Sequence, residues 1–202
     1  IIERCRKITE FLLENGAEII VVACNTATAA AIKTLREEYP IKFIGMEPAI
    51  KPAAQMTRTG VVGVLATAGT LKSDKYLRHK EKYASDIRIA EHVGEGFVEL
   101  VENGKTSGPE AESTVQRSLE PLLAAGADTI VLGCTHYPFL SETISKVAKE
   151  RFPERKVTVI DPAPAVAKHL KEVMKEEALL EATPKEAPSV TLLSSGDSTI
   201  LE

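Results

Sequence analysis

Two cysteines stand at equivalent positions of a repeated stretch. Residues 12–24 and 122–134 share one pattern: a helix end, a glycine stop, an acidic residue and an apolar run, closed by Cys24 in one copy and Cys134 in the other. A glycine after a helical period ends the helix, and a short apolar run between such signals predicts a buried strand. The repeat therefore predicts two similar βα units, each presenting a thiol where its strand ends.

Each of these cysteines is followed by a polar run, Asn25-Thr26 in the first copy and Thr135-His136 in the second. A strand-to-helix transition leaves backbone N–H groups free and favours negative charge, which stabilises a thiolate or a substrate carboxylate. The alternative is a small hydrophobic residue at the end of a strand. Repetition of the whole arrangement favours a functional role, whereas Cys5, on the apolar face of a helix, is predicted to belong to the core.

The spacing of the cysteines argues against a metal centre. Structural zinc takes about four ligands at close spacing, but Cys24 and Cys134 lie far apart in the sequence and His136 is the only imidazole beside either. We therefore expect no metal. A redox disulfide pair is left open, although no feature of the sequence supports it.

The bulk composition sets the class of protein. The chain has 202 residues, 44% of them hydrophobic, and a net charge of −4, which is typical of a soluble globular protein. Without a basic stripe, we expect no nucleic-acid partner held through phosphates. The apolar runs fall short of the roughly 20 residues that span a membrane, no signal peptide is recognised, and three cysteines without disulfide spacing suit a reducing compartment. We expect a cytoplasmic protein.

Alternating elements predict an α/β fold with parallel strands. Expected strands cover residues 18–23, 42–45, 60–65, 86–90, 128–132, 156–160 and 189–193, the first of them buried on both faces. Expected helices cover residues 2–14, 26–38, 49–57, 70–83, 97–102, 109–125, 141–151 and 163–177, and residues 182–188 read as a linker.

The repeat also predicts two related domains. Prolines in the connections at Glu47-Pro48 and Asp161-Pro162 mark crossing points. One domain is placed at 50–160, and the other is assembled from 1–49 plus 161–202. Ligands of open parallel sheets bind beyond the carboxyl ends of the strands, so a cleft between facing domains is expected to hold both thiols.

Residues 23–27 (Ala-Cys-Asn-Thr-Ala) and 132–138 (Leu-Gly-Cys-Thr-His-Tyr-Pro) resemble the two signature motifs of glutamate racemase, in the wider aspartate/glutamate racemase superfamily. Residues 60–70 and 100–104 extend the resemblance, which covers nearly the whole chain. It implies two pseudo-symmetric domains that face each other across a cleft. It also implies cofactor-independent interconversion of L- and D-glutamate by a cytoplasmic homodimer, which supplies D-glutamate for peptidoglycan and cell shape.

The resemblance assigns roles in proton transfer. It implies that Cys24 deprotonates D-glutamate and Cys134 deprotonates L-glutamate. When one thiolate removes the α-proton from one face, the other thiol returns a proton to the opposite face. His136 resembles the histidine that assists the second thiol, and Glu102 the acid on the same side, although Glu99 lies one helical turn earlier. A loop histidine with one hydrogen bond and a solvated glutamate are the alternatives.

Further residues resemble the substrate-binding groups of the family. Asn25, Thr26 and Thr135 are expected to contact the ammonium and carboxylate groups of glutamate. Thr70, and with weaker support Thr67, resemble hydroxyls near the side-chain carboxylate. Helix capping is the alternative for Thr70, and it is compatible with substrate binding.

The sequence departs from the family pattern at its start. The family opens on a strand ending in Asp-Ser and a glycine-rich turn, followed by a Tyr-Gly, and these elements, about fifty residues, do not precede Ile1 here. We expect the 202-residue polypeptide alone to be destabilised, with little racemase activity. Two other functions stay open: a racemase of the superfamily with another substrate such as aspartate, and a non-catalytic regulatory binder, a class that includes family members associated with gyrase inhibition.

Overall fold

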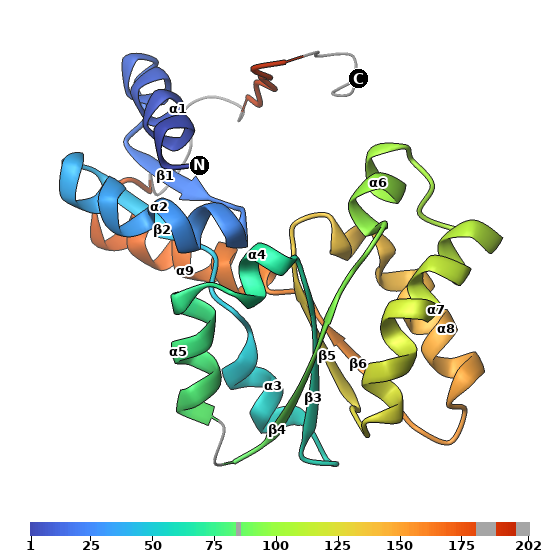
Figure 1. The fold of residues 1–202 in the computed structure, drawn as a ribbon. Helices are drawn as coiled ribbons and strands as arrows, with labels where there is room; N and C mark the ends of the chain where they lie inside the picture. The colour runs from blue at the N-terminus through green and yellow to red at the C-terminus, as the bar shows by residue number, and fades with distance from the viewer. Residues whose placement is uncertain (84–85, 181–188, 197–202) are drawn as a thin grey trace.

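The computed structural model describes residues 1–83, 86–180 and 189–196 (Figure 1). Strands are separated along the chain by one or two helices, as expected for an α/β fold. Their bounds are α1 Ile2–Glu14, β1 Ile19–Val22, α2 Asn25–Glu38, β2 Lys42–Gly45, α3 Ile50–Met56, β3 Val61–Ala66, α4 Ala68–Leu71, α5 Asp74–Tyr83, β4 Arg88–Val93, α6 Phe97–Glu102, α7 Pro109–Ala124, β5 Thr129–Gly133, the 3-10 helix η1 Tyr137–Leu140, α8 Ser141–Arg151, β6 Thr158–Ile160 and α9 Ala163–Glu176.

The strands form two parallel sheets. The larger sheet has the order β4-β3-β5-β6 and the smaller one consists of β1 and β2. Every pairing is parallel, with Val64 opposite Val131 in the large sheet and Val21 opposite Ile44 in the small one. The predicted α/β class with parallel strands is confirmed. The first copy of the repeat contributes β1 to the small sheet, and the second copy contributes β5 to the large sheet.

Helices cover both faces of the large sheet. On one face α6, α7 and α8 enclose a cluster that includes Leu65, Leu119 and Ile130, each 0% exposed. On the other face α3 and α5 pack on Val62, Val64 and Val131 (Figure 1). Because both faces are covered, β3 and β5 are almost fully buried runs, as strands of parallel sheets usually are.

The small sheet is less well covered. Its core is a small cluster around Ile20, Leu35 and Phe43, with α1 and α2 packed against it. Only Ile20 of β1 is buried, and Val21 is 38% exposed. The expectation that this strand is buried on both faces is therefore wrong: α1 and α2 pack on the cluster around Ile20, while α9 contacts the neighbouring strand β2.

Other differences from the predicted elements are local. Residues 189–193, predicted as a last strand, are described and form none, and Val190 is 83% exposed. The strand expected at residues 86–90 is shifted to β4, and η1 was not expected. The predicted linker at 182–188 lies outside the described residues. A membrane span was searched for among the described residues, and none of their helices has the length and apolar character to cross a bilayer.

Candidate active site

Cys134 heads a short chain of side chains at the carboxyl end of β5. Its Sγ lies 3.9 Å from Nδ1 of His136, and Nε2 of His136 lies 2.5 Å from Oε1 of Glu102. His136 comes from the turn before η1, and Glu102 is the last residue of α6. The structure thus brings together the three residues predicted for this side, with Glu102 rather than Glu99 in contact with the imidazole.

The contacts of His136 indicate which ring nitrogen carries hydrogen. A carboxylate only accepts hydrogen bonds, so Nε2–H donates to Glu102 and, in the neutral ring, Nδ1 keeps its lone pair toward the thiol. An imidazole oriented in this way can accept a proton from Cys134. The carboxylate would stabilise the imidazolium that results.

The surroundings of Cys134 shift its acidity. Burial raises the pKa of the thiol above its ordinary value, and the backbone N–H of His136 and the hydroxyl of Thr135 offset part of this rise. Cys24 also raises the pKa, because two negative sulfurs repel each other. The two thiols are therefore close enough to interact electrostatically, and Thr135 lies half-buried in the turn between Cys134 and His136.

Cys24 lies at the N-cap of α2, where β1 ends. Its Sγ accepts a hydrogen bond from the backbone N–H of Ala27 at 3.5 Å, and the residue is exposed. A helix N-terminus stabilises an anionic side chain through its free N–H groups and its dipole. Among the residues that the structure describes, the hydrogen bond of the Cys24 sulfur is to this backbone N–H, whereas Cys134 contacts an imidazole that is backed by a carboxylate.

Three threonine hydroxyls meet between the carboxyl end of β1 and that of β3. Thr26 Oγ1 lies 3.0 Å from Thr67 Oγ1 and 3.1 Å from Thr70 Oγ1, and Thr67 and Thr70 are 3.1 Å apart. Thr67 also caps α4 by accepting the N–H of Thr70. Thr26 follows β1 and the other two follow β3, so the hydroxyls join the carboxyl ends of the two sheets.

Asn25 lies beside these hydroxyls with an unused donor. The residue is 6% exposed, and its Nδ2 has no hydrogen-bond partner among the described residues. It borders a cavity of about 10 Å³ that Thr70 also lines. A buried amide without a partner costs free energy, which a ligand or a water molecule accepting its hydrogen bond would recover.

The prediction from the sequence gave weaker support to Thr67 at this edge and omitted Thr28. Thr67 belongs fully to the hydroxyl cluster although it had weaker support than Thr70. Thr28, 0% exposed, donates to the carbonyl of Val22 at 2.9 Å and accepts the N–H of Met46 at 3.1 Å. It joins the ends of β1 and β2, and its place in the polar run after Cys24 was the only signal for it.

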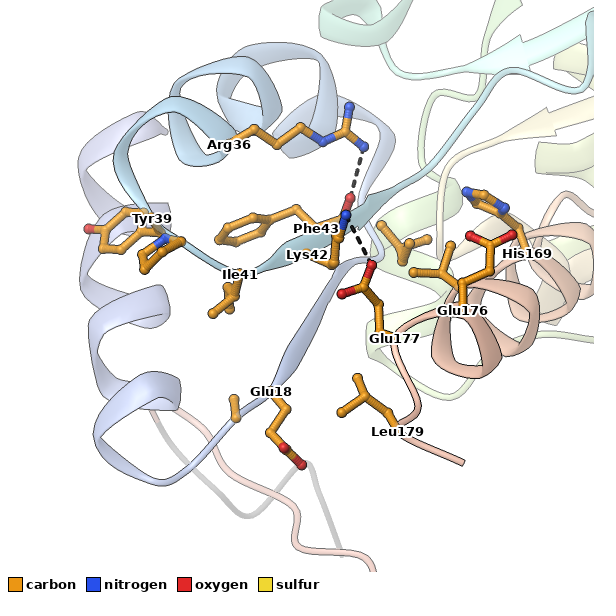
Figure 2. Close-up of a pocket in the computed structure, with 14 residues that line it drawn as sticks. Glu18, Arg36, Tyr39, Ile41, Lys42, Phe43, His169, Glu176, Glu177 and Leu179 are labelled. Carbon is orange, nitrogen blue, oxygen red and sulfur yellow. Dashed lines mark hydrogen bonds and ion pairs between the residues drawn. The ribbon is translucent and has the colours of Figure 1, made fainter. Parts of the chain in front are cut away.

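A larger groove lies away from the cysteines. Its volume is about 890 Å³, and Figure 2 shows it between β2 and α9. Arg36 donates to the carbonyl of Phe43 and Lys42 pairs with Glu177 at 3.1 Å along its walls. The predicted site residues do not line it, so the candidate site is the group of thiols and hydroxyls at the strand ends.

This arrangement suits acid–base chemistry on a small anion. Its functional groups are two thiols, an imidazole, a carboxylate, hydroxyls and an unpartnered amide. Within the described residues, no three or more His, Cys, Asp or Glu side chains are grouped so that they could hold a metal ion.

Comparison with known proteins identifies relatives by sequence and by structure. The Asp/Glu/Hydantoin racemase family profile matches residues 3–170. A glutamate racemase of Ectopseudomonas mendocina is 48% identical over 196 residues, which are 96% of this chain and 72% of that protein. Relatives from other pseudomonads show 45–48% identity over 66–69% of their lengths.

Solved structures agree with the sequence relatives. The Escherichia coli glutamate racemase in complex with L-glutamate and the activator UDP-MurNAc-Ala is 33% identical, with a TM-score of 0.75 over 86% of this chain and 65% of that one. The Francisella tularensis glutamate racemase in complex with D-glutamate is 29% identical, with a TM-score of 0.70 over 86% of this chain and 63% of that one. The chain thus spans about two thirds of the length of these proteins, and it belongs to the Asp/Glu/Hydantoin racemase family.

Proposed function

We propose that the protein interconverts L- and D-glutamate by proton transfer between two cysteines. The observation that carries this proposal is the contact chain from Cys134 through His136 to Glu102, in a fold whose other thiol, Cys24, interacts electrostatically with the first. The named relatives are glutamate racemases, and two of the solved ones hold glutamate of opposite configuration.

The reaction needs one base and one acid on opposite sides of the α-carbon. With L-glutamate, Cys134 is the base: His136 accepts its proton, and the resulting thiolate removes the α-proton to leave a carbanion. Cys24, as the thiol, donates a proton to the other face and ends as a thiolate. The reverse direction starts from that state. Before another L-glutamate reacts, His136 releases its proton to solvent and Cys24 takes one up, so each turnover consumes no net proton and needs no cofactor.

The hydroxyls and the amide are proposed to bind the substrate. Thr26, Thr70 and Thr135 can donate to carboxylates, and Asn25 has an unused buried donor that a carboxylate oxygen would accept. Binding of this kind also orients the α-carbon between the two sulfurs, and positioning contributes strongly to catalysis. Thr67 is added to this set because its hydroxyl contacts both Thr26 and Thr70.

The family resemblance suggests the setting of the reaction. We propose a cytoplasmic homodimer whose D-glutamate enters peptidoglycan synthesis. We also propose that residues 1–49 with 161–202, and residues 50–160, form two units facing each other across the site. The two parallel sheets and the threonine contacts between their ends support this division.

The test is conversion of either enantiomer by the purified natural protein, followed by circular dichroism of the amino acid and by chiral chromatography. We expect glutamate of either configuration to reach a 1:1 mixture, and aspartate to react far more slowly. Conversion of aspartate in preference to glutamate would show that the substrate is aspartate and not glutamate. Binding of glutamate without conversion would favour a regulatory binder.

A further inference from the structure

The contact between Glu102 and His136 is too weak by itself to hold the two side chains together. Both side chains are partly exposed, 47% for Glu102 and 29% for His136, and an exposed ion pair is worth little because water competes and two side chains must be ordered. The two residues are also 34 positions apart in the chain. Their meeting therefore depends on how α6 and the segment around η1 are held together.

Tyr137 provides a buried connection between these elements. It follows His136 directly and is 1% exposed. Its ring packs edge-on against Phe97, the first residue of α6, with centroids 4.9 Å apart and an angle of 64° between the planes. Its hydroxyl donates to the carbonyl of Gly94 at 3.2 Å. One side chain thus fixes both the start of α6 and the turn that leads into it.

Gly94 fits this connection closely. A Cβ on Gly94 would meet the ring and hydroxyl of Tyr137 at 2.6 Å, closer than van der Waals contact permits. Gly96, two residues later, has φ +79°, in the left-handed region that glycine adopts readily, and α6 begins directly after it. The direction of α6, from Phe97 to Glu102 at its far end, is therefore set by the turn on which Tyr137 rests.

We infer that Tyr137 is a positioning residue for the racemisation proposed above: its buried ring and hydroxyl hold α6 so that Glu102 reaches the imidazole of His136. The inference rests on that proposed function. The residue itself does not reach the substrate, and it acts through the pair that prepares Cys134. A purely structural tyrosine would stabilise the fold without changing proton transfer at one thiol in particular.

Isotope effects separate these two roles. L- and D-glutamate have equal free energies, so kcat/KM must change by the same factor in both directions, whichever thiol is impaired. The α-deuterium isotope effect is different: it grows for the substrate whose deprotonation has become more rate-limiting and shrinks for the other. Impairment on the Cys134 side should therefore raise the isotope effect with L-glutamate and lower it with D-glutamate.

The test compares Tyr137→Phe with Tyr76→Phe in the natural protein. Tyr76 is also 1% exposed, and its hydroxyl donates to the partly exposed carboxylate of Glu91 at 2.6 Å on the edge strand β4, so Tyr76→Phe removes one hydrogen bond from another buried tyrosine. We expect Tyr137→Phe to lower kcat/KM about tenfold, as small displacements of catalytic groups do, and to move the two isotope effects in opposite directions. Tyr76→Phe should leave both isotope effects as in the unaltered protein.

A second variant covers a failure of Tyr137→Phe to fold. Gly94→Ala keeps the hydroxyl but displaces the ring, and it should shift the isotope effects in the same two directions. Folded variants whose isotope effects match those of Tyr76→Phe would overturn the positioning role. If the unaltered protein does not racemise glutamate, the proposed function itself fails, which is a separate result seen before any variant is made.

Discussion

The two copies of the repeat end in the same residue type but support it differently. Cys134 follows a fully buried strand of a four-stranded sheet and contacts His136, which in turn contacts Glu102. Cys24 follows a strand of a two-stranded sheet, is exposed, and accepts a hydrogen bond from the backbone N–H of Ala27. The position equivalent to His136 in the first copy is Thr26, which bonds to other hydroxyls. Equivalent backbone positions therefore supply the thiols, while local substitutions decide how each thiol is prepared.

The largest effects are expected at the thiols themselves. Cys24→Ser and Cys134→Ser should each lower racemisation by about 100- to 10,000-fold, since a serine hydroxyl is a far weaker acid and general acid–base groups contribute on this scale. Cys5→Ser is the control. Cys5 packs at the edge of the small core, so this variant should leave turnover unchanged. Substantial turnover in either of the first two variants would contradict the two-thiol mechanism.

The two strands offer a matched pair for stability. Val131 is 1% exposed and Val21, at the equivalent position, is 38% exposed. Val131→Ala should lower the free energy of unfolding by about 2–3 kcal/mol, because two buried methyl groups are lost and a cavity remains. Val21→Ala should cost less than about 1 kcal/mol. Urea unfolding measures both, and equal costs would show that β1 is as well covered as β5.

The imidazole of His136 should affect proton transfer at Cys134 more than at Cys24. His136→Asn removes the proton acceptor next to Cys134 and is expected to lower kcat/KM about 10- to 100-fold. The α-deuterium isotope effect should then rise with L-glutamate and fall with D-glutamate. Glu102→Gln should change both quantities in the same direction but less, since the imidazole is retained. A shift of the opposite sign would exchange the roles of Cys24 and Cys134.

The raised pKa of Cys134 gives a pH prediction. Burial holds this thiol protonated to a higher pH than an ordinary cysteine, and only the thiolate is alkylated. In a variant lacking Cys5 and Cys24, the rate of alkylation by iodoacetamide should rise with a midpoint above about 8.5, the ordinary value. Because Cys24 itself raises the pKa of Cys134, the midpoint in the variant that lacks Cys24 should lie below the midpoint in a protein that retains Cys24. A midpoint well below 8.5 would mean that the N–H donors outweigh burial.

The last comparison concerns the acidic residues of the repeat. Burial of Asp128 opposes its charge, but hydrogen bonds from Thr57 and from the N–H groups of Arg58 and Thr59 outweigh it and lower the pKa of Asp128. A lowered folded-state pKa adds stability above the unfolded value of about 3.9, which is lost as pH falls through the folded-state value.

Asp128→Asn should therefore cost about 1–3 kcal/mol at neutral pH and flatten the loss of stability in acid. Glu18, at the equivalent position of the first copy, is exposed, so Glu18→Gln is the control, with an expected change within about 0.5 kcal/mol. Urea unfolding from pH 2 to 7 measures both. Parallel pH profiles for Asp128→Asn and the unaltered protein would refute this role.

Much of the architecture could be predicted from local signals. Glycine stops and apolar runs place β1 and β5, and the polar residues after each strand gather at the carboxyl ends because parallel strands all end at the same edge. The chain of Cys134, His136 and Glu102 was predicted from the family resemblance, and the structure shows its contacts.

The remainder depends on contacts that no local pattern encodes. Glu99 and Glu102 both lie on α6, and the sequence leaves open which one meets His136; in the structure α6 packs on Tyr137 through Phe97, and Glu102 makes the contact. The exposure of Val21 depends on what covers the small sheet, and a strand at 189–193 requires a partner edge as well as alternating residues. In each case tertiary packing decides what propensity leaves open.

The most direct test of the two-thiol account is early racemisation of L-glutamate in D₂O, followed by mass spectrometry of the separated enantiomers. The account predicts deuterium at the α-carbon of the D-glutamate formed, and protium in the L-glutamate that remains, because Cys134 removes the proton and Cys24 delivers deuterium to the other face. Product that retains the α-protium, or equal deuterium in both enantiomers from the first turnovers, would contradict it.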